Sequence, residues 1–131
     1  MMRAVVDTHA LVWYFTRPAR LGASALRHLR AAEAGRAIAL VPSIALVELA
    51  LLRDRGRRVP GTAEIETTLA RCRGIVVAAF GPGEAHEFAM IGNVPDPFDR
   101  MMIATARAAD CPLISADERI GASGLVEVMW D

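Results

Sequence analysis

Residues 3–15 read RAVVDTHALVWYF and join a short extended pattern directly to a helical one. The segment from Arg3 to Val6 contains adjacent β-branched residues and predicts a strand, and the stretch from Thr8 to Phe15 predicts a helix. Asp7 lies at the junction between the two. In a parallel sheet this junction is the carboxyl end of a strand, which is the edge where open α/β sheets bind their ligands.

The same alternation continues along the chain. Further strands are predicted at residues 37–41, 75–79, 113–115 and 125–129. Further helices are predicted at residues 21–34, 43–55, 62–72, 83–91 and 97–109. Gly35 and Gly56 are expected to end two of these helices, and Ser43 is expected to cap the start of one. The pattern predicts an α/β fold with a central, mostly parallel sheet flanked by helices on both faces.

Length and composition indicate one globular domain that spans residues 1–131. The chain is long enough to bury a single core, and 53% of its residues are hydrophobic. Its most apolar window, residues 37–52, contains Pro42 and Glu48 and is shorter than the roughly 20 apolar residues of a spanning helix, so we expect no membrane partner. Asp7 comes before a signal-peptide core would be complete, and we therefore expect a cytoplasmic location.

All fifteen basic residues are arginines, and fifteen acidic residues balance them to a net charge of zero. The absence of lysine excludes a P-loop protein and a Schiff-base enzyme, because both need a lysine amine. It also argues against receiver domains and haloacid-dehalogenase phosphatases, two α/β classes that gather acids at strand ends and use a lysine. Genomic base composition is the simpler explanation of the arginine bias, although arginine also suits bidentate contacts with phosphate.

Four carboxylates interrupt or border apolar runs, namely Asp7, Glu48, Asp99 and Asp117. Asp7 and Asp117 follow predicted strands. Glu48 has apolar neighbours at helical spacing, and Asp99 lies in the first turn of a predicted helix. A buried ionised carboxylate needs a cation or a network of hydrogen-bond donors. We therefore expect the four acids to share one cation, and oxygen ligands of this kind suit Mg²⁺, with Mn²⁺ as a substitute.

Most of these acids also have simpler explanations. Asp96 and Pro97 form a good helix start, and an N-cap role explains Asp96 as well as a catalytic role does. Taken singly, Asp7 and Asp117 are ordinary turn residues after strands. Glu48 is the hardest to explain in this way, because a solvated glutamate would normally have polar neighbours on its helix face. The hypothesis of a metal site therefore depends on the four acids together.

The order and spacing of these motifs resemble those of PIN-domain ribonucleases and, more narrowly, of the VapC toxins of bacterial toxin–antitoxin pairs. The resemblance extends from Val5 nearly to the C-terminus. The matching stretches are VVDTHALVW at 5–13, Pro42-Ser43 followed by Glu48, DPFDR at 96–100 and LISAD at 113–117. It implies a single PIN-like domain that cleaves RNA with the help of a metal ion, forms a homodimer and binds a cognate antitoxin.

The resemblance also implies the roles of individual residues. It assigns the catalytic and metal-binding roles to the four acids, Asp7, Glu48, Asp99 and Asp117. Thr8 and Ser115 match small hydroxyl positions near the metal, and Asp96 matches an acid common in this subfamily. The metal ion is expected to activate a water molecule for in-line attack on an RNA phosphodiester, with one carboxylate accepting the proton.

Two features bear on the partners of such a site. Residues 53–58 form the densest basic cluster of the chain. Runs of this kind usually lie at a solvated helix end, but this one could also bind RNA phosphates through Arg53, Arg55, Arg57 and Arg58. Val94 and Pro95 stand where the family often has a histidine or an arginine, so the contact made there does not carry over.

The alternative function is a non-catalytic PIN-like module that binds RNA or protein, and the presence of all four acids argues against it.

Overall fold

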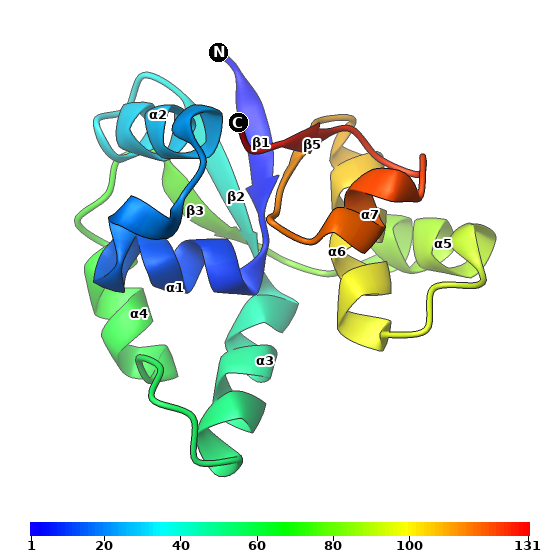
Figure 1. Cartoon of the computed structure of the whole chain (residues 1–131), viewed down its shortest axis with the longest axis horizontal. Coiled ribbons are helices and arrows are strands. Elements are labelled where there is room, and N and C mark those ends of the chain that lie inside the picture. Colours follow the sequence, from blue (N-terminus) through cyan, green and yellow to red (C-terminus); the bar gives the residue numbers. More distant parts are fainter.

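The computed structural model describes residues 1–131 as a five-stranded sheet with helices on both sides (Figure 1). The strands are β1 Arg3–Val6, β2 Ile38–Pro42, β3 Ile75–Ala78, β4 Leu113–Ile114 and β5 Val128–Met129. Their order across the sheet is β3-β2-β1-β4-β5, and every neighbouring pair is parallel. The predicted α/β fold is confirmed, and the sheet is entirely parallel.

Seven α-helices and one short 3-10 helix connect the strands. Their bounds are α1 Thr8–Thr16, η1 Pro18–Arg20, α2 Ala23–Glu33, α3 Ser43–Asp54, α4 Thr62–Leu69, α5 Pro82–Ile91, α6 Pro97–Ala109 and α7 Glu118–Ala122. In Figure 1, α1, α2 and α4 lie on the left of the molecule, α3 lies below the strands, and α5 to α7 lie on the right. None of these helices combines the length and the apolar character that crossing a bilayer requires.

The core is built around the central strand β1. Its residues Ala4, Val5 and Val6 are fully buried, because strands pair with both of its edges and helices cover both of its faces. Leu11 of α1 and Ile103 of α6 are also fully buried and belong to the same cluster of 24 core residues. Each aliphatic side chain of this size contributes about 1.5–3 kcal/mol when it is removed from water.

The chain order places a topological switch point beside β1. From β1 the chain continues to β2 and β3 on one side, and it later returns to β4 and β5 on the other. In Figure 1 the carboxyl ends of β1 and β2 point toward the lower half of the view, where α1, α3 and α6 begin. Ligands of open α/β sheets bind at such a point. The predicted acids at the ends of β1 and β4 therefore lie where a site is expected.

Several predicted boundaries were wrong. The second helix begins at Ala23 and not at residue 21, the fourth ends at Leu69 and not at residue 72, and the last strand has only two residues. Ser43 is not a helix cap: it is the first residue of α3, and its hydroxyl accepts a hydrogen bond from the Phe80 N–H at 3.1 Å. By contrast Gly35 and Gly56 end their helices with positive φ, as predicted.

Candidate active site

Asp7 is held in one orientation by hydrogen bonds at the end of β1. It is 5% exposed, and its Oδ1 accepts a hydrogen bond of 2.7 Å from the N–H of Thr8, the first residue of α1. Its Oδ2 accepts a hydrogen bond of 2.8 Å from the hydroxyl of Ser115, which follows β4 and is itself buried. The same Ser115 oxygen accepts the N–H of Asp117 at 3.1 Å. The two central strands thus end in one continuous hydrogen-bond network.

His9, in the first turn of α1, extends this network to the loop after β4. Its Nε2 accepts a hydrogen bond from the Ala116 N–H at 3.0 Å, and its Nδ1 lies 3.3 Å from Asp7 Oδ2. Because a backbone N–H can only donate, Nε2 carries no proton, and the ring proton is on Nδ1, facing the Asp7 carboxylate. His9 therefore orients Asp7. Its place after Asp7 in the motif was the only signal in the sequence.

Glu48, on α3, is half-buried in a region that disfavours negative charge. Burial raises the pKa of its carboxyl group, and the carboxylates of Asp7 and Asp96 raise it further. The Thr8 hydroxyl opposes the rise, although the two groups do not meet the geometry of a hydrogen bond. The predicted orientation of Glu48, away from a solvated helix face and toward the other acids, is consistent with these effects.

Asp99, in the first turn of α6, has the most strongly raised carboxyl pKa of the four acids. Burial raises this pKa from 3.8 to about 6, with further contributions from the charges of Asp96, Asp7 and Asp117. Arg119 lowers it only in part. Burial is thus the main cause of the raised pKa, and the charges of the nearby acids add to it.

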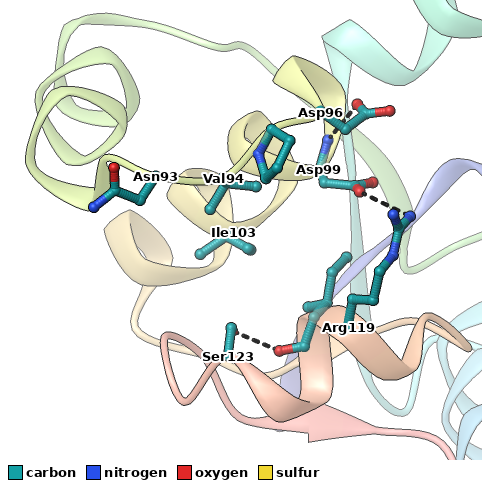
Figure 2. Close-up of a pocket in the computed structure, with 9 residues that line it drawn as sticks. Asn93, Val94, Asp96, Asp99, Ile103, Arg119 and Ser123 are labelled. Carbon is teal, nitrogen blue, oxygen red and sulfur yellow. Dashed lines mark hydrogen bonds and ion pairs between the residues drawn. The ribbon is translucent and has the colours of Figure 1, made fainter.

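Asp117 has a different environment from the other acids. It caps α7, where its Oδ1 accepts the Arg119 N–H at 2.9 Å, and its Oδ2 lies 3.3 Å from the Arg119 guanidinium. Although burial raises the pKa of Asp117, these hydrogen bonds and the arginine charge bring it below its usual value. The same guanidinium lies 3.8 Å from Asp99, as Figure 2 shows, and so bridges the two acids. No pattern in the sequence identified Arg119.

Three of the four predicted acids line a single hollow of about 390 Å³, which we call the acidic cavity. They are Asp7, Glu48 and Asp99, and the cavity is also lined by Thr8, His9, Val12, Trp13, Arg20, Leu52, Arg57 and Val59. Asp117 does not line it and is connected to it through Ser115 and Arg119. Asp99 lines both the acidic cavity and a second hollow of about 160 Å³, whose lining also includes Val94, Asp96 and Arg119 (Figure 2).

The donor groups of the acidic cavity fit a hydrated divalent cation. They are carboxylate and hydroxyl oxygens, and Thr8 Oγ1 is buried without a hydrogen-bond partner, which calls for a water molecule or an ion nearby. No three acidic, histidine or cysteine side chains are arranged to ligate one ion directly. A divalent cation held here would therefore keep water molecules among its ligands.

The remaining predicted site residues have distinct positions. Asp96 caps α6 as predicted, since its Oδ1 accepts the N–H groups of Phe98 at 2.8 Å and Asp99 at 3.2 Å. Among the four candidate RNA-binding arginines, only Arg57 lines the acidic cavity. Arg53 donates to the carbonyl oxygen of Val59 at 2.7 Å and so braces a loop. The other two are exposed and make no side-chain contact at this cavity, namely Arg55 and Arg58.

Comparisons with known proteins agree with this architecture. The sequence matches the PIN domain family over residues 4–123. VapBC2 from Rickettsia felis, bound to a promoter DNA fragment, contains a chain of similar fold, with 15% identity and a TM-score of 0.73 over 99% of this chain and 100% of that one. VapBC from Salmonella typhimurium, bound to DNA, gives 14% identity and a TM-score of 0.66, covering 98% and 97% of the two chains.

A third similar structure is FitAcB from Neisseria gonorrhoeae, with 16% identity and a TM-score of 0.58, covering 98% of this chain and 96% of that one. At such identities these structures show a shared fold alone. A comparison with curated proteins gives no match. The family match covers most of the chain and includes all four acids, Asp7, Glu48, Asp99 and Asp117. The chain therefore belongs to the PIN domain family, as its motifs predicted.

Proposed function

We propose that this protein is a metal-dependent endoribonuclease and the toxin of a VapC-type toxin–antitoxin pair. One observation carries the proposal: carboxylates from three separate elements, Asp7, Glu48 and Asp99, line one cavity at the switch point of the sheet. Burial raises the pKa of the Glu48 and Asp99 carboxyl groups, and the charges of neighbouring acids raise both further, so ionising these two groups opposes folding. Such a cluster is found at functional sites because a bound cation offsets the repulsion there.

The cation would be held by Asp7 and Asp99, with Glu48 and the Thr8 hydroxyl next to it and Asp117 completing the group through its links to Ser115 and Arg119. Mg²⁺ is the proposed ion, and Mn²⁺ is its proposed substitute. When bound, such an ion polarises a phosphate oxygen and lowers the pKa of a water molecule.

The side chains around the cavity have separable roles in the proposed reaction. Ser115 and His9 hold the Asp7 carboxylate in one orientation. One of the carboxylates around the cavity would accept the proton of the attacking water molecule. Hydrolysis of an RNA phosphodiester in this way would leave a 5′-phosphate and a 3′-hydroxyl.

We also propose a cognate antitoxin and a second copy of this chain as protein partners, and the cytoplasm as the location. The antitoxin is supported by the similar structures, which are VapBC and FitAcB complexes. RNA as the substrate is supported by the motif resemblance to PIN-domain ribonucleases and by the exposed arginine run at residues 53–58. Co-expression with the neighbour-encoded partner, followed by size-exclusion chromatography, tests the pairing.

Cleavage of total RNA by antitoxin-free protein tests the proposed reaction. We expect cleavage with Mg²⁺, none with EDTA, and a loss of at least about 100-fold in Asp7→Asn, because this change removes one charge of the metal site. Asp54→Asn is the matched control, since Asp54 is an exposed acid at the end of α3 outside the cavity. Cleavage in EDTA, or equal cleavage by both variants, would contradict the proposal.

The second candidate function is a PIN-like module that binds RNA or protein without cleaving it. The ion pairs of Arg119 with Asp99 and Asp117 favour this alternative, because a positively charged side chain of the protein itself partly neutralises the acids. The alternative would be supported if folded, antitoxin-free protein binds RNA but leaves it intact with Mg²⁺ and with Mn²⁺.

A further inference from the structure

The acidic cavity has a second wall that is basic and aromatic. Besides the carboxylates, it is lined by Trp13, Arg20 and Arg57. Both arginines are exposed, and neither takes part in any of the ion pairs or side-chain hydrogen bonds of the structure. Two guanidinium groups beside three carboxylates thus keep their donors free for a ligand.

Arg20 is fixed by stacking and not by an ion pair. Its guanidinium carbon lies 4.1 Å from the centre of the Trp13 ring, a distance at which the cation is attracted to the ring face. Trp13 is held in turn by edge contacts with His9, at 5.0 Å between ring centres, and with Trp130, at 6.1 Å. Because His9 also contacts Asp7, a chain of direct contacts connects the arginine to the acids.

Arg57 is placed by a braced loop. The Arg57 N–H donates to the carbonyl oxygen of Leu52 at 3.0 Å, and the Arg57 carbonyl accepts the N–H of Val59 at 3.2 Å. The Arg53 side chain donates to the Val59 carbonyl at 2.7 Å and closes the same loop. Leu52 and Val59 line the acidic cavity together with Arg57, so the loop backbone is held where the guanidinium reaches the cavity.

A ligand of this cavity must satisfy both walls. The carboxylates require a cation between themselves and any anion, whereas the free guanidinium groups require anions of their own. An RNA strand meets both demands, because it carries a phosphate at every nucleotide and guanidinium groups bind phosphate oxygens in a bidentate way. A folded acidic protein is a poorer match, because its carboxylates are not repeated at a fixed short spacing.

We propose that Arg20 and Arg57 bind the backbone phosphates on either side of the cleaved one, with Arg20 positioned by Trp13. This inference rests on the proposed ribonuclease function and adds residues to its substrate site. Arg20, Arg57 and Trp13 are positioning residues. Contacts with phosphates are independent of base sequence, so the three residues set where the strand lies and not which sequence is cut.

Binding of RNA without cleavage tests the inference. The probe is a short, fluorescein-labelled single-stranded RNA of random sequence, titrated with protein in Ca²⁺, a divalent cation that also takes oxygen ligands. Binding is followed by fluorescence anisotropy at several salt concentrations, and a gel verifies that the RNA stays intact. We expect Arg20→Gln and Arg57→Gln each to weaken binding several-fold. The slope of log affinity against log salt should fall by about 0.7 for each arginine that is replaced, as for one lost phosphate contact on a single strand.

Matched controls separate this effect from a general loss of positive charge. Arg17→Gln and Arg71→Gln each remove an exposed arginine that does not line the cavity, and both should bind as the wild type does. Trp13→Phe keeps an aromatic face and should retain most of the affinity, whereas Trp13→Leu should lose as much as Arg20→Gln. Thermal melts of all variants identify any loss of binding that comes from unfolding.

The possible failures are distinguishable. If the wild type binds and cleaves RNA but all four arginine variants behave alike, this inference is overturned and the ribonuclease function stands. If the wild type neither binds nor cleaves any RNA, both are overturned. Binding of polyglutamate with the same dependence on Arg20 and Arg57, without binding of RNA, would overturn the inference in favour of an acidic protein partner. In the supporting case, Arg20→Gln and Arg57→Gln also raise KM several-fold more than they lower kcat.

Discussion

The Asp99 carboxylate is partly buried and lies near three other acids. Burial and the charges of Asp96, Asp7 and Asp117 raise its pKa from 3.8 to about 6, and Arg119 opposes only part of the rise. Between these two values the folded protein binds more protons at this residue than the unfolded chain does. Stability therefore falls as the pH rises from about 4 to above 6, because folding then has to place an ionised group among like charges.

Replacing Asp99 with asparagine should remove this penalty. With no divalent cation present, Asp99→Asn is expected to be more stable than the wild type at pH 7 by about 1–2 kcal/mol, a value reduced from the full pKa difference because the site is partly solvated. Below pH 4 the two proteins should be equally stable. Urea unfolding in EDTA at both pH values measures the difference. A variant that is less stable at pH 7 would contradict the raised pKa.

The identity of the acids could be predicted from the sequence, but their surroundings could not. Asp7 and Asp117 follow strands, and Glu48 interrupts an apolar helix face, so local patterns make them candidates. Only the four acids together, with the resemblance to PIN domains, predict a metal site. Arg119 and His9 are different, because their roles arise from contacts across the fold: the first bridges two acids, and the second joins α1 to the loop after β4. No periodicity or spacing encodes a contact of this kind.

At the scale of secondary structure elements, length decided what the sequence could predict. The long helices and the central strands have enough residues for the regular spacing of their apolar side chains to be recognised. Their bounds were predicted within a few residues. The helix α7 was not predicted, because Glu118–Ala122 is little more than one turn and shows no period. The last strand was predicted too long, since only Val128–Met129 pairs with β4. Short elements owe their structure to the neighbours on which they pack.

The start of α2 shows such a tertiary constraint. A Cβ atom on Gly22 would lie 2.2 Å from the carbonyl oxygen of Trp130, which also accepts the N–H of Ala25 at 3.0 Å. Gly22→Ala should therefore destabilise the protein by about 1–3 kcal/mol, as overpacking does. It should also disturb the contact of Trp130 with Trp13. Urea unfolding measures the first effect, and tryptophan fluorescence measures the second.

Gly83→Ala is the matched control for this prediction. Gly83 lies near the start of α5, and nothing lies within 4 Å of the position of an added Cβ. Alanine favours a helix over glycine by up to about 1 kcal/mol, so this variant should be equally stable or more stable than the wild type. If both variants change stability in the same direction, the close approach of Gly22 to Trp130 does not constrain the fold.

At the scale of the whole molecule, the fold brings together three acids that are far apart in the sequence. Asp7 after β1, Glu48 on α3 and Asp99 on α6 line one cavity. The unfolded chain separates these acids and so has no comparable site for a cation. A divalent cation that binds between them must therefore bind the folded state preferentially, and binding of that kind adds to the free energy of unfolding.

Mg²⁺ should consequently raise the melting temperature of the wild type. At about 100 times its Kd, the ion adds about 2.7 kcal/mol to the free energy of unfolding, which corresponds to roughly 10 °C for a chain of this size. Asp7→Asn and Asp99→Asn should lose most of this shift, and Asp54→Asn should keep it. Thermal melts with a Mg²⁺ titration measure all four proteins. An equal shift in all of them would place the cation outside the acidic cavity.

Asp99→Asn is itself expected to be stable without metal. Its melting temperature in EDTA should approach that of the Mg²⁺-loaded wild type. Removing the Asp99 charge and neutralising it with a cation both abolish the same unfavourable repulsion among the acids.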